Sequence, residues 1–247
     1  MLYLAPFIFI GIIILLSAFF IVGVCLFLSR SINDIQEQQF DDKLDISGKY
    51  LGRIVETYVT DHKNAVAQVA NNLSIVEPRG YDDVMSKVHK LYPGFLTMLV
   101  ADQDAKIVSA SPQALMVQLQ DGDFSVADRA YFSQAFFEQH LYVSPVFLGR
   151  GFGADPIVAI SAPIYGASHD KPVGIVEGSL NLNMFEQLNP SVVNDRQIDV
   201  VLTDENDNII YADADLALTT LAKFNFSVDQ ENLKHELMVI DSHSSSN

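Results

Sequence analysis

The stretch Asp128-Arg129-Ala130-Tyr131-Phe132 places a guanidinium group close to two aromatic rings. Arginine offers a planar fork of donors that can hold a carboxylate with two parallel hydrogen bonds. An aromatic ring two residues further along can form the wall of a small pocket. The alternative is purely structural: Arg129 pairs with Asp128 near a helix start, and the rings lie in the core. The stretch therefore indicates either an anion-binding pocket or a local ion pair.

Other residue types that carry chemistry lack the partners that catalysis or metal binding requires. The histidines His89, His140 and His169 come without a convincing nucleophile or metal set, and no serine lies in a Gly-x-Ser-x-Gly setting. The acidic run from Asp204 to Asp215 lacks the glycine and the final glutamate of a helix-loop-helix calcium site. We therefore expect no enzyme activity, no metal and no cofactor.

The composition excludes further classes of partner and site. The chain has 31 acidic against 15 basic residues and a net charge of −16, whereas a nucleic-acid partner requires basic patches. Its one cysteine, Cys25, lies inside an apolar run. The remaining chain therefore has no thiol for a disulfide, a cysteine zinc site or a cysteine nucleophile.

An apolar run near the N-terminus predicts a membrane anchor over residues 7–28. The 22 residues from Phe7 to Leu28 carry no charge and, as a helix, are long enough to cross a hydrocarbon core. A cleavable signal peptide is the rival interpretation. It fits less well because no basic residue precedes the run and no clear cleavage site follows. The only close basic flank is Arg30, which alone is a weak guide to orientation.

A long helix is expected to follow, over residues 31–76. Apolar or small residues recur in steps of three and four from Phe40 to Val69, and no proline interrupts the pattern before Pro78. Such a helix could pack with a copy of itself, or its second half could lie against a sheet. His62 on this face is expected to be a packed histidine and not a metal ligand.

The next segment predicts an α+β module over residues 77–190. Five strands are expected at Phe95–Ala101, Lys106–Ala110, Leu141–Leu148, Pro156–Tyr165 and Pro172–Leu182, with helices before the first and between the second and third. Consecutive antiparallel hairpins of this kind form one sheet with a face free for a ligand. Residues 191–247 contain a second apolar run, acidic turn and apolar run at Ile198–Ala212, which repeats the pattern of Phe95–Ala110.

This order of elements closely resembles the double Cache (dCache) sensor region, the extracytoplasmic PAS-like ligand sensor of bacterial receptors. The resemblance covers about residues 31–215. It rests on the hairpin at 95–110, on Asp128–Ala135, on Tyr142-Val143-Ser144-Pro145, on residues 160–164 and on residues 174–180. It implies a PAS-like antiparallel sheet with flanking helices, a transmembrane helix before it and an incomplete second module after it. About 50 residues remain after Gln197, fewer than a complete module of this family has.

The resemblance also implies which residues bind a ligand. Arg129 occupies the position that holds a ligand carboxylate, and Tyr131 the position of the aromatic wall, while Phe132 replaces a tyrosine. Ser179 occupies the position where amino-acid sensors carry an aspartate for the ammonium group. A buried ammonium without a counter-charge is strongly disfavoured, so a carboxylate without an amine, or a neutral polar molecule, is the expected ligand. The alternative is that Asp155 restores a negative charge from the hairpin. The full expected set is Asp128, Arg129, Tyr131, Phe132, Tyr142, Ser144, Ser161, Ser179 and Ser109.

The implied function is small-molecule sensing for a histidine kinase, a chemoreceptor or a cyclic-di-GMP signalling protein, with a helix shift passed to the membrane. The expected location is the inner (cell) membrane, with one span and a periplasmic or extracellular sensor domain. The expected partners are a small ligand, the membrane and a second copy along the long helix, but no nucleic acid. The alternative is a membrane-anchored adaptor whose pocket is vestigial.

Overall fold

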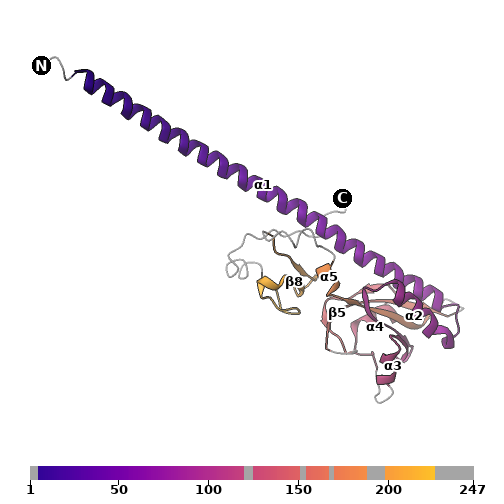
Figure 1. Ribbon diagram of the computed structural model, residues 1–247. Coiled ribbons are helices and arrows are strands. Elements are labelled where there is room, and N and C mark those ends of the chain that lie inside the picture. The colour runs from indigo at the N-terminus through magenta and orange to yellow at the C-terminus, as the bar shows by residue number, and fades with distance from the viewer. Residues whose placement is uncertain (1–4, 120–124, 151–153, 167–169, 188–197, 226–247) are drawn as a thin grey trace. The chain divides into compact units, whose positions relative to one another are not determined.

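The computed structural model describes residues 5–119, 125–150, 154–166, 170–187 and 198–225. The chain divides into two units, Met1–Tyr50 and Leu51–Asn247. One helix, α1 (Ala5–Leu73), begins in the first unit and ends in the second, so the predicted anchor and the predicted long helix form one element (Figure 1). No proline or helix-ending glycine separates the two segments, which explains why the helix continues.

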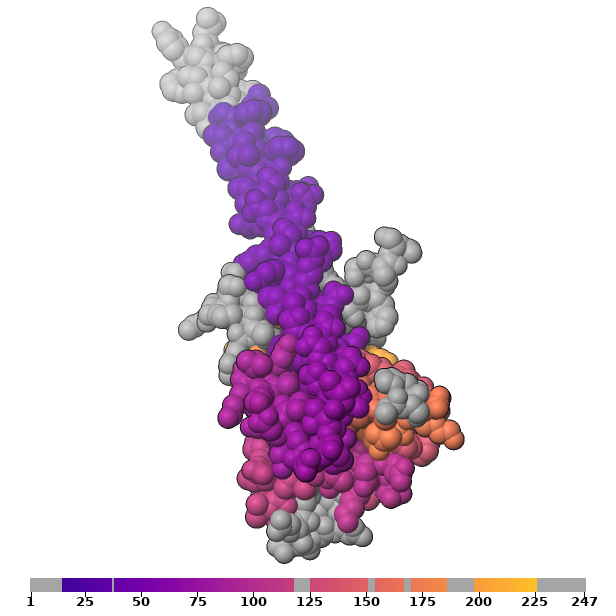
Figure 2. Space-filling model, turned by 90° about the vertical axis from the view of Figure 1, so that its right-hand side faces the viewer, coloured from indigo at the N-terminus to yellow at the C-terminus, as the bar shows by residue number. Residues whose placement is uncertain are grey.

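The first unit is the start of α1, and its side chains between Leu15 and Leu28 are uncharged, largely apolar and exposed. Leu16, Phe19 and Phe27 expose 65%, 79% and 70% of their surface. The most apolar window of the helix has a mean hydropathy of 2.1, so by length and composition this helix can cross a membrane. Figure 2 shows the described side chains of this segment, in indigo, as a single column.

The second unit contains an antiparallel sheet, and an α+β fold is therefore confirmed. The strands are β1 (Phe95–Asp102), β2 (Ile107–Ser111), β3 (Tyr142–Val143), β4 (Phe147–Leu148), β5 (Pro156–Tyr165) and β6 (Pro172–Asn181). Their order is β2-β1-β6-β5-β3, and β4 also pairs with β5. The sheet is thus centred on β6, which is hydrogen-bonded on both sides.

Two hydrophobic clusters cover the two faces of this sheet. The last part of α1 and helix α2 (Tyr81–Leu91), which follows the 3₁₀ turn η1 (Pro78–Gly80), pack on one face through Val66, Val69 and Met85 (Figure 1). Helices α3 (Ala114–Leu119) and α4 (Ala130–Phe136) belong to the cluster on the opposite face. Because side chains alternate along a strand, odd-numbered residues of β6 point to the α4 side and even-numbered ones to the α1 side.

The prediction of a single third strand over residues 141–148 is wrong. Ser144, Pro145 and Val146 separate β3 from β4. Ser144 stays bound to β5 through its N–H, which donates to the carbonyl of Ala159 (2.9 Å), and its Oγ, which accepts from the Ala159 N–H (2.9 Å). The N–H of Val146 instead donates to Oδ2 of Asp204 (3.0 Å). A contact from far along the chain therefore takes this segment out of the strand.

His62 is a packed histidine, as expected. Its ring lies against Tyr58 and Phe95, with centroids 4.2 and 4.7 Å away, and its Nδ1 is 2.7 Å from the carbonyl oxygen of Tyr58. The Tyr58 hydroxyl donates to the carbonyl of Gly94 (3.1 Å). Burial lowers the pKa of His62, so its ring is neutral at pH 7. This cluster joins the second half of α1 to the start of β1.

After α5 (Met184–Gln187), the predicted repeat is present as the hairpin of β7 (Val201–Thr203) and β8 (Ile209–Ala212), followed by η2 (Ala214–Leu216). Its turn repeats that of the first hairpin bond for bond. Asp102 Oδ1 accepts from the N–H of Asp104 and Lys106, and Asp204 Oδ1 accepts from those of Asn206 and Asn208. The residue two positions before the returning strand has φ 59° in both turns, Ala105 and Asp207. The oxygens of Asp204 are therefore occupied by N–H donors. Residues 191–197 and 226–247 of the predicted second module lie outside the described residues.

Replacement of Gly178 by alanine is expected to destabilise the second unit. A Cβ at Gly178 would lie 2.4 Å from Cε1 of Phe95, whose ring is 2% exposed and packed on His62. Overpacking of this kind costs about 1–3 kcal/mol. Scanning calorimetry of the full chain in detergent should show the lower melting temperature.

Gly52→Ala is the matched control for this substitution. Gly52 lies in α1, where an added Cβ would meet nothing within 4 Å, and alanine favours a helix by about 1 kcal/mol over glycine. This variant should be at least as stable as the wild type. Equal melting temperatures for Gly178→Ala and the wild type would contradict the packing described.

Candidate functional site

A cavity of about 80 Å³ lies on the α4 side of the sheet, several times the volume that one water molecule needs. Strands β1 and β6 form its floor, and the segment that leads into α4 and the hairpin between β4 and β5 form its walls. Its lining is largely apolar with a few charged groups. The lining residues are Leu96, Thr97, Leu99, Ile107, Leu115, Ser125, Val126, Arg129, Tyr131, Phe147, Gly149, Arg150, Asp155, Ile157, Glu177 and Ser179.

Strand β6 carries Glu177 and Ser179 on the cavity side of the sheet. Glu177 is paired with Leu99 of β1 and Ser161 of β5, so it stands in the middle of the sheet and is only 1% exposed. The Ser179 hydroxyl donates to Oε1 of Glu177 (2.7 Å). Among the described residues Oε2 has no hydrogen-bond partner. One carboxyl oxygen thus remains available at the floor of the cavity.

Arg129 and Tyr131 come from the start of α4. Arg129 has extended backbone angles (φ −92°, ψ 130°) at the N-cap, and the following residues are helical. The Ser161 hydroxyl donates to the carbonyl of Tyr131 (2.8 Å), and Ala135 of the same helix is fully buried. These contacts fix the helix start against the sheet. The two side chains singled out from the sequence therefore both line the cavity.

The Arg129 guanidinium has no hydrogen bond or ion pair within the part of the chain that the structure describes. Its Cζ lies 5.1 Å from the centre of the Phe147 ring, in a cation–π contact. Asp128 pairs with Arg150 instead, so the structural alternative of a pair between Asp128 and Arg129 is not what the chain forms. No described residue therefore occupies the donors of Arg129.

Burial raises the pKa of Glu177 to about 8, an effect that Ser179 and the charge of Arg129 only partly offset. The carboxyl is therefore mostly protonated at pH 7 in the ligand-free cavity. Burial, together with the charge of Glu177, also raises the pKa of Tyr131. The Tyr131 phenol consequently stays neutral and can donate a hydrogen bond.

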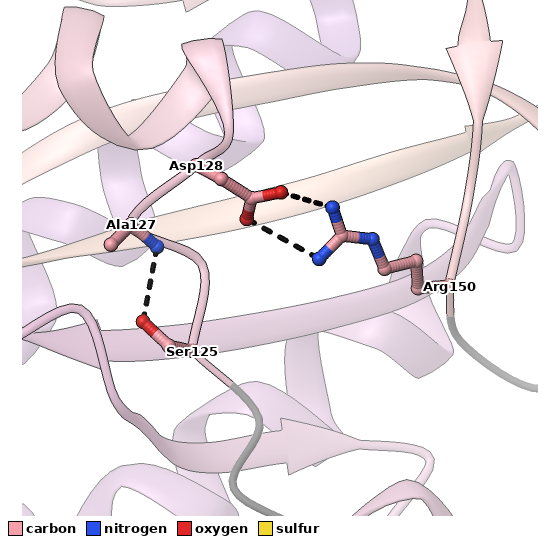
Figure 3. A network of polar contacts seen from close by, with 4 residues as sticks. All are labelled: Ser125, Ala127, Asp128 and Arg150. Atoms are coloured by element: carbon pink, nitrogen blue, oxygen red, sulfur yellow. Dashed lines mark hydrogen bonds and ion pairs between the residues drawn. The ribbon is translucent and has the colours of Figure 1, made fainter.

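An ion pair lies at the edge of the cavity (Figure 3). The guanidinium of Arg150, from the β4–β5 hairpin, holds both carboxylate oxygens of Asp128 and lowers the pKa of that group. Ser125 accepts from the N–H of Ala127 (3.2 Å) and caps the turn before α4, while the helix itself has no side-chain cap. Neither Ser125 nor Asp128 therefore caps α4 with its side chain.

Three residues of the predicted set, Arg129, Tyr131 and Ser179, line the cavity, and the others do not. Phe132 is buried and stacks on Phe136. Tyr142 is paired with Ser161, and the Ser144 and Ser161 hydroxyls are bound to the backbone of Ala159 and Tyr131.

Ser109 lies on the opposite side of the sheet. It is paired with Val100, and its hydroxyl donates to Asp82 of α2 (2.5 Å). The register of β2 on β1 therefore turns this side chain away from the cavity.

Sequence reasoning missed Glu177 and Phe147. Glu177 precedes Ser179 by two residues, and the period of two along a strand places both side chains on the same face. That period was the signal that could have identified it. The position of Phe147 depends on the break between β3 and β4, which no local pattern shows.

The antiparallel sheet with its long N-terminal helix is the fold of chemoreceptor ligand-binding domains. The domain of CtaA from Pseudomonas fluorescens, solved with L-leucine, matches with TM-score 0.61 and 18% identity over 78% of each chain. The domain of Tlp3 from Campylobacter jejuni, solved with 4-methylisoleucine, matches with TM-score 0.57 and 12% identity over 75% of this chain and 74% of that one.

An extracellular ligand binding receptor from Desulfohalobium retbaense matches with TM-score 0.61 and 12% identity, over 76% of this chain and 33% of its own. The chemoreceptor domains are Cache-type sensor domains, so the resemblance seen in the sequence is confirmed at the level of the fold. No protein-family model and no curated protein matches the chain.

Proposed function

We propose that this chain is the extracytoplasmic small-molecule sensing module of a signal-transduction receptor. The observation that carries the proposal is that one cavity is lined by the guanidinium of Arg129, which has no hydrogen bond or ion pair among the described residues, and by the carboxyl of Glu177, of which one oxygen has no partner among them. Buried polar groups normally find partners within the fold. Glu177 is such a buried group, and Arg129, which is half-buried, lines the same cavity. The two together point to a ligand, and the fold of known ligand-binding domains supports this.

The ligand that fits best carries both a carboxylate and an ammonium group. Arg129 would bind the carboxylate with two hydrogen bonds, and the floor of the cavity would take the amine. The argument against an amine rested on the serine at position 179, but Glu177 lies beside it on the same face of the strand and would supply the counter-charge. Leu99, Ile107 and Ile157 would surround an aliphatic side chain. α-Amino acids are therefore the first candidates, a choice that the ligands of CtaA and Tlp3 support.

The alternative of a vestigial pocket is not favoured. It predicts a cavity filled by the chain's own side chains and charged groups paired with one another. The cavity instead has open volume, and Arg129 and Glu177 do not form an ion pair with each other.

The start of α1 would anchor the module in the cell membrane with a single span, and the second unit would face the periplasm or the outside. A displacement of β6 on ligand binding would reach α1 through the start of β1. There Phe95 contacts His62, and the carbonyl of the preceding Gly94 accepts a hydrogen bond from Tyr58. The helix would then pass the shift toward the membrane as a change in population, with a second copy packed along α1.

The test of the proposed function is a binding panel on the full chain in detergent micelles. L-alanine, L-serine, L-valine, L-leucine and L-isoleucine are titrated by calorimetry, with 4-methylpentanoate as leucine without its amine. We expect at least one amino acid to bind more tightly than 4-methylpentanoate. If only 4-methylpentanoate binds, the ligand is a carboxylate without an amine, as the sequence predicted. If no compound of the panel gives a binding heat, the proposed ligand class is contradicted.

A further inference from the structure

The acid at the floor of the cavity is held by a single neutral donor. Glu177 lies on the central strand β6, and only the Ser179 hydroxyl donates to it among the described residues. Its second oxygen has no partner in the same part of the chain. A carboxylate in such a place would lack the several donors or the paired cation that buried charges normally have.

The charged and titratable groups around this acid do not neutralise it. Arg129 lies over the Phe147 ring without an ion pair to Glu177, and Arg150 is held by Asp128. Tyr131 of α4 is neutral, and Asp155 of the β4–β5 hairpin adds negative charge to the same cavity. Histidine, the side chain whose ordinary pKa lies between pH 6 and 8, is not among the described lining residues.

The cost of ionising Glu177 therefore depends on what the cavity holds. In the ligand-free protein, burial keeps the carboxyl protonated, in agreement with its raised pKa. A ligand ammonium beside it would supply the missing positive charge and favour the ionised form. A ligand without an amine would leave the acid neutral.

We propose that Glu177 is a proton-exchanging specificity residue, which is protonated in the empty cavity and releases its proton to solvent when the ammonium group of a ligand binds. The step breaks the O–H bond of the carboxyl and transfers the proton to the buffer. This inference rests on the proposed function and adds that external pH sets the affinity. It makes the pocket a sensor of two variables, the ligand and the proton.

Two consequences separate ligands with and without an amine. The affinity for L-leucine should rise by up to tenfold per pH unit between pH 6 and pH 8, because the proton must leave before the complex is complete. The affinity for 4-methylpentanoate should instead fall as the pH rises above 8, because an ionised Glu177 then repels its carboxylate.

The experiment is calorimetric titration of the full chain at pH 7 in HEPES and in Tris, whose ionisation enthalpies differ. The probe is the amino acid that binds most tightly in the panel. The difference in heat between the buffers gives the protons released, and we expect close to one per ligand bound. Glu177→Gln cannot ionise and should bind the amino acid more weakly than the wild type. Its binding heat should be the same in both buffers, and its affinity should not change between pH 6 and 8.

Each outcome bears on one proposal. Binding without any buffer dependence would overturn the proton exchange and leave the sensing function intact. Buffer dependence that persists in Glu177→Gln would assign the proton to another group.

A second measurement requires no ligand. The infrared C=O stretch of a protonated carboxyl should be present at pH 7 in the wild type and absent from Glu177→Gln. Identical spectra for the two proteins would overturn the proposal even where no panel member binds.

Discussion

Arg129→Ala is expected to weaken binding of the panel amino acid by more than about 100-fold. The guanidinium would form two charge-assisted hydrogen bonds with the ligand carboxylate, each worth about 1.5–3 kcal/mol. The loss of both amounts to roughly 3 kcal/mol or more, which corresponds to over 100-fold in Kd. The fold should be unaffected because Arg129 has no hydrogen bond or ion pair with the described residues. Calorimetric titration measures the first effect and thermal unfolding the second.

Two further variants make this result specific. Arg129→Lys keeps the charge but loses the planar fork, so its affinity should lie between those of the wild type and the alanine variant. Arg150 lines the same cavity, but its side chain is exposed and already paired with Asp128. Arg150→Ala should therefore change the affinity for the amino acid only slightly. Loss of binding in Arg150→Ala with normal binding in Arg129→Ala would place the carboxylate at the hairpin instead.

The wild type should lose stability relative to Glu177→Gln as the pH rises from 5 to 9. The pKa of Glu177 is raised from 4.5 in the unfolded chain to about 8 in the folded one, so the unfolded state releases the proton first. The contribution to stability is fully present below pH 4.5 and is lost as the pH rises through 8. At about 1.4 kcal/mol per pKa unit, the total is on the order of a few kcal/mol.

Scanning calorimetry of both proteins at pH 5, 7 and 9 measures this difference. The glutamine variant mimics the neutral acid, so it should match the wild type at pH 5 and be the more stable protein at pH 9. Asp128→Asn is the matched control, because its carboxylate is exposed and its pKa is shifted downward. A constant difference between the wild type and Glu177→Gln at all three pH values would show that Glu177 is ionised throughout.

Local patterns determined the elements of this protein well. The uncharged run from Phe7 and the uninterrupted helical pattern after it predicted α1, although not that they form one helix. Apolar runs separated by acidic turns predicted both hairpins. That prediction succeeds for a chemical reason, because an aspartate side chain that accepts from the next N–H groups fixes the turn in Asp102 and in Asp204 alike. The same local information was enough to place Arg129 and Tyr131 together at a helix start.

Only the tertiary structure decided which side chains meet at the site. A strand by itself does not show which of its faces a helix covers, so Ser109 and Ser179 look equivalent in the sequence. The pairing of β1 with β2 turns Ser109 toward α2, while that of β1 with β6 turns Ser179 toward α4. The same register brings Glu177 into the cavity that Arg129 lines, from 48 positions further along the chain. Charge, burial and proton affinity at this point depend on contacts between distant segments, and no local spacing carries that information.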